Sequence, residues 1–156
     1  MDRLSEHVSY KEAVRSNTAE RKGIDNTPNA NQLENMIVLC EAIFEPLRIW
    51  ANNPIYISSF FRSETLNKEV GGSETSKHCA IIGAAIDLDA DVYGGKSNAE
   101  LFHFIRTNLS FDKLVWEFGS ASNPSWVHVS YNEYNNRGLI YTAYRNSEGI
   151  AECIKM

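Results

Sequence analysis

The spacing of hydrophobic residues changes once along this chain, and that change constrains the fold more than any other feature. Up to about residue 110 the spacing is mainly helical, most clearly in "NTPNANQLENMIVLCEAIFEPLRIWA" (residues 26–51). Beyond it, hydrophobic and polar residues alternate in "KLVWEF", "WVHVSY", "LIYTAY" and "IAECIKM", with Gly- and Asn-containing turns between them. Helices first and strands last predict an α+β fold, in which N-terminal helices pack on a mostly antiparallel sheet that ends in a meander. The helix of residues 26–51 is predicted to face the core with Leu33, Met36, Ile37, Cys40, Ile43, Phe44 and Leu47.

Shorter elements are marked by helix-capping residues and turn residues. Ser9 with Glu12, and Ser97 with Glu100, have the spacing of capping boxes that begin helices. We predict helices at residues 9–16, 63–70 and 97–109, and an earlier strand at residues 54–60. No internal repeat, low-complexity tract or linker divides the chain, so residues 1–156 are expected to form a single domain.

Charge and composition exclude several classes of protein. A net charge of -5 without a cluster of Lys and Arg argues against nucleic-acid binding, because phosphate contacts need grouped cations. No apolar stretch approaches the ~20 residues that span a bilayer, and the charged N-terminus lacks the apolar run of a secretory signal. Cys40, Cys79 and Cys153 are odd in number and show no metal-type pair spacing, so we expect no disulfide framework and synthesis in a reducing cytoplasm.

Two of the four histidines are candidates for chemistry. His128 in "WVHVSY" shares a strand face with Trp126 and Ser130, and His78 precedes Asp87 in "SKHCAIIGAAIDLDA". Two imidazoles and one carboxylate are a donor set of catalytic zinc sites. Spacing alone leaves two interpretations open, a metal site or three residues that never meet. The other two, His7 and His103, are expected to serve solvation or packing.

The order of motifs around these residues resembles the zinc D-Ala-D-Ala carboxypeptidase family, which includes vancomycin-resistance D,D-dipeptidases and phage L-alanoyl-D-glutamate endopeptidases. The family pattern is Ser-x-His, then Gly-x-Ala-x-Asp, then a distant His on a strand. Ser76 and His78 match the first element, "GAAID" ending at Asp87 the second, and His128 the third. Arg62 in "SSFFRS" matches the family's Ser-x-x-Arg-Ser segment. The resemblance runs from about residue 4 to residue 132 and implies a hedgehog/D-Ala-D-Ala peptidase-like fold with Zn²⁺ held by His78, Asp87 and His128.

This chain departs from the family pattern in its spacing. Four residues, "CAII", separate His78 from Gly83 where relatives have two, so Asp89 is an alternative ligand to Asp87 on the same strand face. We prefer Asp87 because it keeps the Gly-x-Ala-x-Asp spacing. We also interpret the small residues from Gly83 to Ala85 as allowing the backbone to pass close to the metal, although Gly83 also reads as an ordinary turn glycine.

The resemblance also implies roles around the metal. Arg62 is expected to stabilise the negative charge of the tetrahedral intermediate or to bind a substrate carboxylate. A surface ion pair with Glu64 or Glu69 is the alternative for Arg62. Ser76 is predicted either to orient substrate or to cap the turn before His78, and Cys79 to be a buried apolar residue rather than a ligand.

The general base is predicted to be Glu117. Many relatives place this carboxylate three residues before the last histidine, where this chain has Ser125, so another acid must serve. Glu117 lies in "KLVWEFG", on a strand expected to form a hairpin with "WVHVSY". That pairing would bring it close to the level of His128, on the face opposite Trp116. Asp112 at the start of the same strand is the weaker candidate.

We therefore expect a monomeric zinc peptidase acting on peptidoglycan stem peptides, as a carboxypeptidase or an endopeptidase, with no nucleic-acid partner and no membrane span. The alternatives are a catalytically silent zinc-containing domain of the same fold that binds peptidoglycan, and a structural protein without metal in a virion or cell envelope. By resemblance, the site of action is the cell wall, reached after phage-mediated release or as part of a virion.

Overall fold

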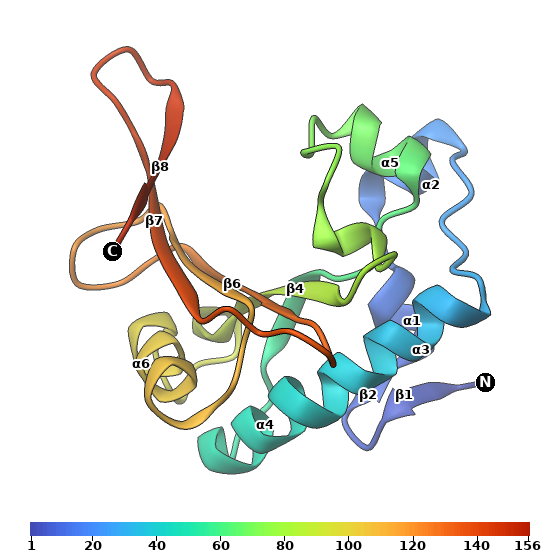
Figure 1. Cartoon of the computed structure of the whole chain (residues 1–156), viewed down its shortest axis with the longest axis horizontal. Coiled ribbons are helices and arrows are strands. Elements are labelled where there is room, and N and C mark those ends of the chain that lie inside the picture. The colour runs from blue at the N-terminus through green and yellow to red at the C-terminus, as the bar shows by residue number, and fades with distance from the viewer.

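The computed structural model describes all 156 residues, and its elements follow the predicted change from helices to strands (Figure 1). The α-helices are α1 (Tyr10–Val14), α2 (Asn17–Lys22), α3 (Ala30–Leu39), α4 (Glu45–Ala51), α5 (Glu64–Glu69) and α6 (Asn98–Asn108). The strands are β1 (Arg3–Ser5), β2 (Val8–Ser9), β3 (Tyr56–Ser59), β4 (Ala84–Asp89), β5 (Lys113–Glu117), β6 (Trp126–Tyr131), β7 (Leu139–Arg145) and β8 (Ala151–Lys155). A π-helical turn η1 (Cys40–Phe44) and two 3₁₀ turns, η2 (Lys77–Cys79) and η3 (Ala90–Val92), complete the chain. The predicted α+β fold is confirmed.

The predicted long helix forms, but it is not regular throughout. It begins after Asn29, whose side chain caps the Gln32 N–H, and continues through α3, η1 and α4 to Ala51. The π-helical turn ends two residues before Pro46, which has no N–H to donate and whose ring would crowd a normal preceding turn. The hydrophobic pattern still holds, because every residue of the predicted stripe is buried or packs half-buried against the core: Leu33, Met36, Ile37, Cys40, Ile43, Phe44 and Leu47.

A six-stranded sheet in the order β3-β4-β6-β5-β7-β8 forms the second layer. Helices α3 and α6 contact strands β4, β5 and β6, so the helical layer covers one face of the sheet (Figure 1). Ile86, Leu114 and Val127 point into the core that the two layers share. The residues next to them, Asp87 and His128 included, alternate to the opposite face. On that face the segment from α5 to η2 stands on one side and the β7–β8 hairpin on the other (Figure 1).

The last strands differ from the predicted meander. β6 lies antiparallel beside β5 as predicted, but β7 lies on the other side of β5 and runs parallel to it. Arg137 in the connecting segment explains this order, because its Nε and Nη2 donate to the Asp112 carboxylate at 2.8 and 2.9 Å. The Leu139 N–H also donates to the Asp112 carbonyl, so β7 begins where β5 begins.

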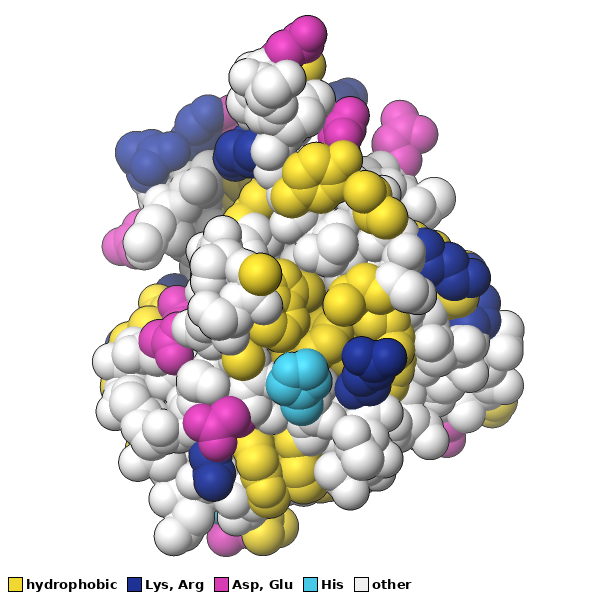
Figure 2. All heavy atoms as spheres, turned by 90° about the vertical axis from the view of Figure 1, so that its left-hand side faces the viewer, with side chains coloured by type: hydrophobic (Ala, Val, Ile, Leu, Met, Phe, Trp, Pro, Cys, Tyr) yellow, Lys and Arg dark blue, Asp and Glu magenta, His cyan; other side chains and the backbone are white.

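One face of the molecule shows how charged and hydrophobic side chains are distributed on its surface (Figure 2). On the side of the molecule drawn in Figure 2, hydrophobic side chains are exposed between scattered charged ones, and neither charge sign forms a large continuous patch. None of the helices combines the length and the apolar character that crossing a bilayer requires. Cys40, Cys79 and Cys153 are all free thiols.

Candidate metal centre

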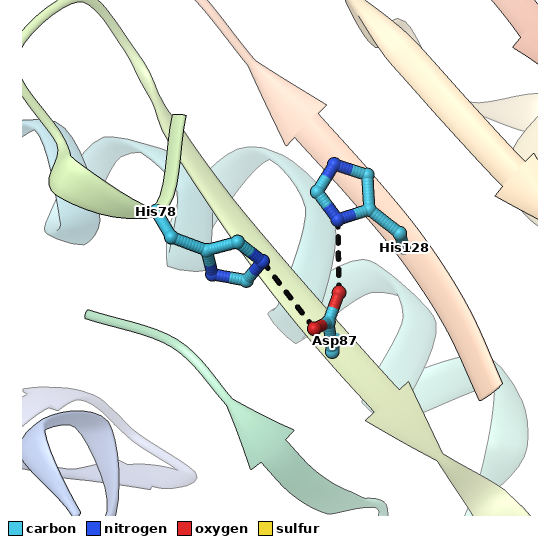
Figure 3. Close-up of side chains that lie close together, drawn as sticks. All are labelled: His78, Asp87 and His128. Carbon is cyan, nitrogen blue, oxygen red and sulfur yellow. Dashed lines mark hydrogen bonds and ion pairs between the residues drawn. The ribbon is translucent and has the colours of Figure 1, made fainter. Parts of the chain in front are cut away.

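Three side chains that are distant in sequence meet on the sheet face that the helices leave open (Figure 3). Asp87 and His128 are direct partners across the antiparallel β4–β6 pair, so both side chains leave the sheet on the same side. His128 Nδ1 lies 2.9 Å from Asp87 Oδ1, and His78 Nε2 lies 3.3 Å from Asp87 Oδ2. The potential ligand atoms all lie within 4.8 Å of one another. The fold thus brings together the three residues that the motifs indicate.

His78 is held so that one ring nitrogen remains free. Its turn is capped by Ser76, whose hydroxyl accepts the His78 N–H at 3.2 Å, and its carbonyl accepts the Arg62 N–H at 2.9 Å. The His78 Nδ1 lies 2.6 Å from the Phe60 carbonyl oxygen, which can only accept, so Nδ1 carries the ring proton. In the neutral ring the lone pair of Nε2 is therefore turned toward the centre, since metal-binding histidines are commonly oriented by a hydrogen bond from their other ring nitrogen. Sequence reasoning missed this contact, because a backbone acceptor has no residue signature.

The Asp87 carboxyl is ionised at neutral pH. Burial by itself would raise its pKa, but the positive charge of the His78 and His128 rings when protonated, together with the hydrogen bonds that they then donate, outweighs burial and holds the pKa of Asp87 well below its usual range. One buried anion and two imidazole nitrogens supply three donors and leave a fourth position for water or substrate, as in catalytic zinc sites. The residues at this centre therefore fit zinc.

Gly83 is required by the approach of two strands. Its φ is +71°, and a Cβ at this position would lie 2.4 Å from the Tyr131 carbonyl oxygen. We expected the small residues here to let the backbone pass the metal, and for Gly83 that interpretation was wrong, because its close neighbour is the backbone of β6. The tight start of the β4–β6 pair supports the register that places Asp87 opposite His128.

The four residues "CAII" do not shift the register of Asp87. The carbonyls of Cys79 and Ala80 accept hydrogen bonds from side-chain amides of α3, at 3.0 and 2.9 Å. Ile81 and Ile82 then project into solvent, so the extra length bulges outward. Asp89 accepts a hydrogen bond from Asn98 Nδ2 at 2.9 Å and does not belong to the cluster around His78 and His128.

Arg62 points to the centre and not to a surface partner. Its Nη2 lies 3.8 Å from Asp87 Oδ2, and its Nη1 lies 3.5 Å from Asn67 Oδ1. Of the two expected surface partners, Glu69 pairs with Lys22, and Glu64 forms no ion pair with Arg62. The guanidinium is thus positioned beside the open side of the centre.

Glu117 shares the face of His128. It pairs directly with Trp126, while His128 pairs with Val115, so Glu117 lies two residues along the strand from the level of His128. Burial raises the pKa of the Glu117 carboxyl and the Asp87 charge raises it further, whereas His128, Lys113 and Arg62 lower it. The pKa remains above its ordinary value, which is typical of a carboxyl adapted for proton transfer.

The other candidate residues have different surroundings. Asp112 accepts hydrogen bonds from the Arg137 side chain and from its N–H, and these bonds lower the pKa of Asp112. This residue is therefore an anchor between β5 and β7. His7 Nδ1 lies 2.7 Å from Glu45 Oε2, and His103 is exposed on α6. Cys79 is buried, as predicted.

Two histidines, one carboxylate and an open fourth position are typical of a mononuclear metallohydrolase centre. A comparison with known families identifies the kind of metallohydrolase. The family described as Peptidase M15 matches residues 6–130, and the chain belongs to this family. It is therefore a member of the zinc-dependent, D-Ala-D-Ala carboxypeptidase-like metallopeptidases, as the motifs indicated. The matched residues include His78, Asp87 and His128 but neither β7 nor β8. No curated protein matches the chain.

Proposed function

We propose that this protein is a zinc-dependent peptidase that hydrolyses the stem peptides of peptidoglycan, as a D-Ala-D-Ala carboxypeptidase or an endolysin-type endopeptidase. The proposal is supported above all by one arrangement, the His78–Asp87–His128 cluster and the Glu117 carboxyl on the same open sheet face. A catalytically silent relative would need the metal ligands but no base. A half-buried acid beside them therefore favours the enzyme.

In this proposal the zinc would be held by His78 Nε2, the Asp87 carboxylate and His128 Nδ1. When bound, it would supply an activated water and polarise the scissile carbonyl. Glu117 accepts the proton of the attacking water on its carboxylate and donates it to the nitrogen of the leaving amine. The raised pKa of Glu117 suits this role, because a carboxylate with a pKa closer to the working pH is the stronger base.

Arg62 and Ser76 are assigned to the substrate. The Arg62 guanidinium is turned toward the centre by Asn67 and Asp87, where it can stabilise the charge on the carbonyl oxygen or bind the terminal carboxylate of a stem peptide. The Ser76 oxygen accepts the His78 N–H, so it caps the turn. Its hydroxyl proton remains available for a substrate acceptor.

Digestion of purified muropeptides, followed by mass spectrometry, tests the function. The zinc-loaded protein should release defined fragments of the stem peptide, and Glu117→Gln should keep its zinc while hydrolysis falls by at least about 100-fold. The matched control is Glu133→Gln, which alters an exposed carboxyl in the segment between β6 and β7. Unchanged hydrolysis by Glu117→Gln would remove Glu117 from the mechanism, and intact muropeptides after incubation with the wild type would refute the substrate class.

A further inference from the structure

The face that carries the candidate metal centre continues across β5, β7 and β8. Val115 lies directly opposite His128, Tyr141 beside Val115, and Lys155 opposite Tyr141. Directly paired residues project from the same face of a sheet, so one row leads from His128 to Lys155. Neighbouring strands are about 4.8 Å apart, which places Tyr141 about 10 Å from His128.

Lys113 belongs to the same face and is held on an aromatic ring. It precedes Val115 by two residues in β5, and its Nζ lies 4.7 Å from the centroid of the Tyr141 ring. This distance is typical of a cation–π contact, which fixes the ammonium group without neutralising it. No carboxylate forms an ion pair with Lys113, whereas Lys96, the other lysine that lies over a ring, also pairs with Glu100.

The positive charge of Lys113 influences a residue two strands away, Cys153 on β8. On β8, burial raises the pKa of the Cys153 thiol, while Lys113 lowers it and Glu117 raises it. The strand register explains why Glu117 and Cys153 influence each other, because Cys153 pairs with Ala143 and Ala143 pairs with Glu117, so both side chains project from the same face of the sheet. Lys155 adds a second positive charge to this side of the sheet, and like Lys113 it has no ion-pair partner.

We propose that Lys113, Tyr141 and Lys155 form an anion-binding subsite for a carboxylate of the substrate. The subsite lies across the metal centre from Arg62, which stands toward β3 and α5. It rests on the proposed peptidase function and narrows the substrate class to acidic peptides. Because an extended peptide rises about 3.3 Å per residue, the recognised carboxylate belongs about three residues from the scissile bond. Two of the three residues lie beyond the part of the chain that the family match covers.

Matched pairs of synthetic stem peptides test this subsite. Within each pair one carboxylate is converted to its primary amide, so that only the charge changes. For one pair we expect the wild type to show a KM about tenfold lower for the acid than for the amide at similar kcat, the scale of one charge-assisted hydrogen bond. Lys113→Gln should raise the KM for the acid to that for the amide, and Lys113→Arg should keep the preference.

The matched control is Lys96→Gln, which removes a lysine that lies 5.0 Å over the Trp50 ring in the helical layer. It should behave as the wild type on both peptides. The subsite would be overturned if the wild type preferred the acid over the amide in none of the pairs. It would also be overturned if Lys113→Gln kept the preference for the acid or lost activity on acid and amide equally.

Binding separates this inference from the proposed function. The same peptide pairs are titrated calorimetrically into the zinc-loaded Glu117→Gln protein, with and without Lys113→Gln. If the wild type cleaves no peptide but the acid binds about tenfold more tightly in a Lys113-dependent manner, the peptidase function fails and the subsite stands. If peptides are cleaved but acid and amide bind equally well, the subsite fails and the function stands.

Discussion

Replacing Gly83 by alanine should destabilise the fold and weaken zinc binding together. A left-handed φ of +71° costs a residue with a Cβ about 1 kcal/mol. The new Cβ would also lie 2.4 Å from the Tyr131 carbonyl oxygen, so the β6 backbone must move by about 1 Å to reach ordinary contact. Overpacking of this kind costs about 1–3 kcal/mol, which gives a total loss of about 3 kcal/mol in the free energy of unfolding.

Gly138→Ala provides the matched control. Gly138 has a φ of +67°, but nothing lies within 4 Å of its Cβ position, so only the backbone cost of about 1 kcal/mol applies. Urea denaturation in the presence of a chelator measures both losses without the contribution of bound metal. Because movement of β6 shifts His128 relative to Asp87, the zinc dissociation constant of Gly83→Ala should rise about tenfold, and that of Gly138→Ala should not change. Equal destabilisation by the two variants would refute the role assigned to the β4–β6 approach.

Two further variants separate the substrate site from the scaffold. Arg62→Ala should keep its zinc but lower kcat/KM on muropeptides by about 100-fold. Arg62→Lys should recover kcat/KM only in part, because a point charge does not reproduce the guanidinium fork. Near-normal turnover by Arg62→Ala would contradict a role of Arg62 in binding substrate or stabilising the transition state. Asp112→Asn should lower the free energy of unfolding by about 2 kcal/mol at pH 7 without loss of zinc or hydrolysis. Because hydrogen bonds from Arg137 hold the folded-state pKa of Asp112 below its unfolded value, this stabilisation is present above about pH 4 and is lost as the pH falls through the folded pKa. Urea denaturation of the metal-free proteins should therefore show the difference between Asp112→Asn and wild type shrinking toward pH 3, and a constant difference would contradict the pairing.

The elements were predictable because they depend on local periodicity. The stripe from Leu33 to Leu47 and the alternation in β6 follow from which residues face the core, and both are confirmed. The π-helical turn before Pro46 was not predicted, since a hydrophobic pattern does not report a local widening of the helix. The parallel β5–β7 pair was also missed, because alternation marks strands without their neighbours, and the Arg137–Asp112 contact that fixes their order is tertiary.

The candidate site was predictable where residue types define it. Motif spacing pointed to His78, Asp87 and His128, and the structure places them together, whereas the Phe60 carbonyl that orients His78 left no trace in the sequence. The sequence pattern predicted the sheet face of Glu117 correctly. Its position opposite Trp126, two residues from the level of His128, became clear only from the register between β5 and β6.

The metal content of purified protein tests the central claim most directly. Inductively coupled plasma mass spectrometry should find about one zinc per chain, as expected for a three-ligand catalytic centre. His78→Ala, Asp87→Ala and His128→Ala should lose that zinc, whereas Asp89→Ala, which changes the neighbouring carboxylate bonded to Asn98, should keep it. A protein without zinc, or one that loses zinc in Asp89→Ala and retains it in Asp87→Ala, would contradict the centre described here.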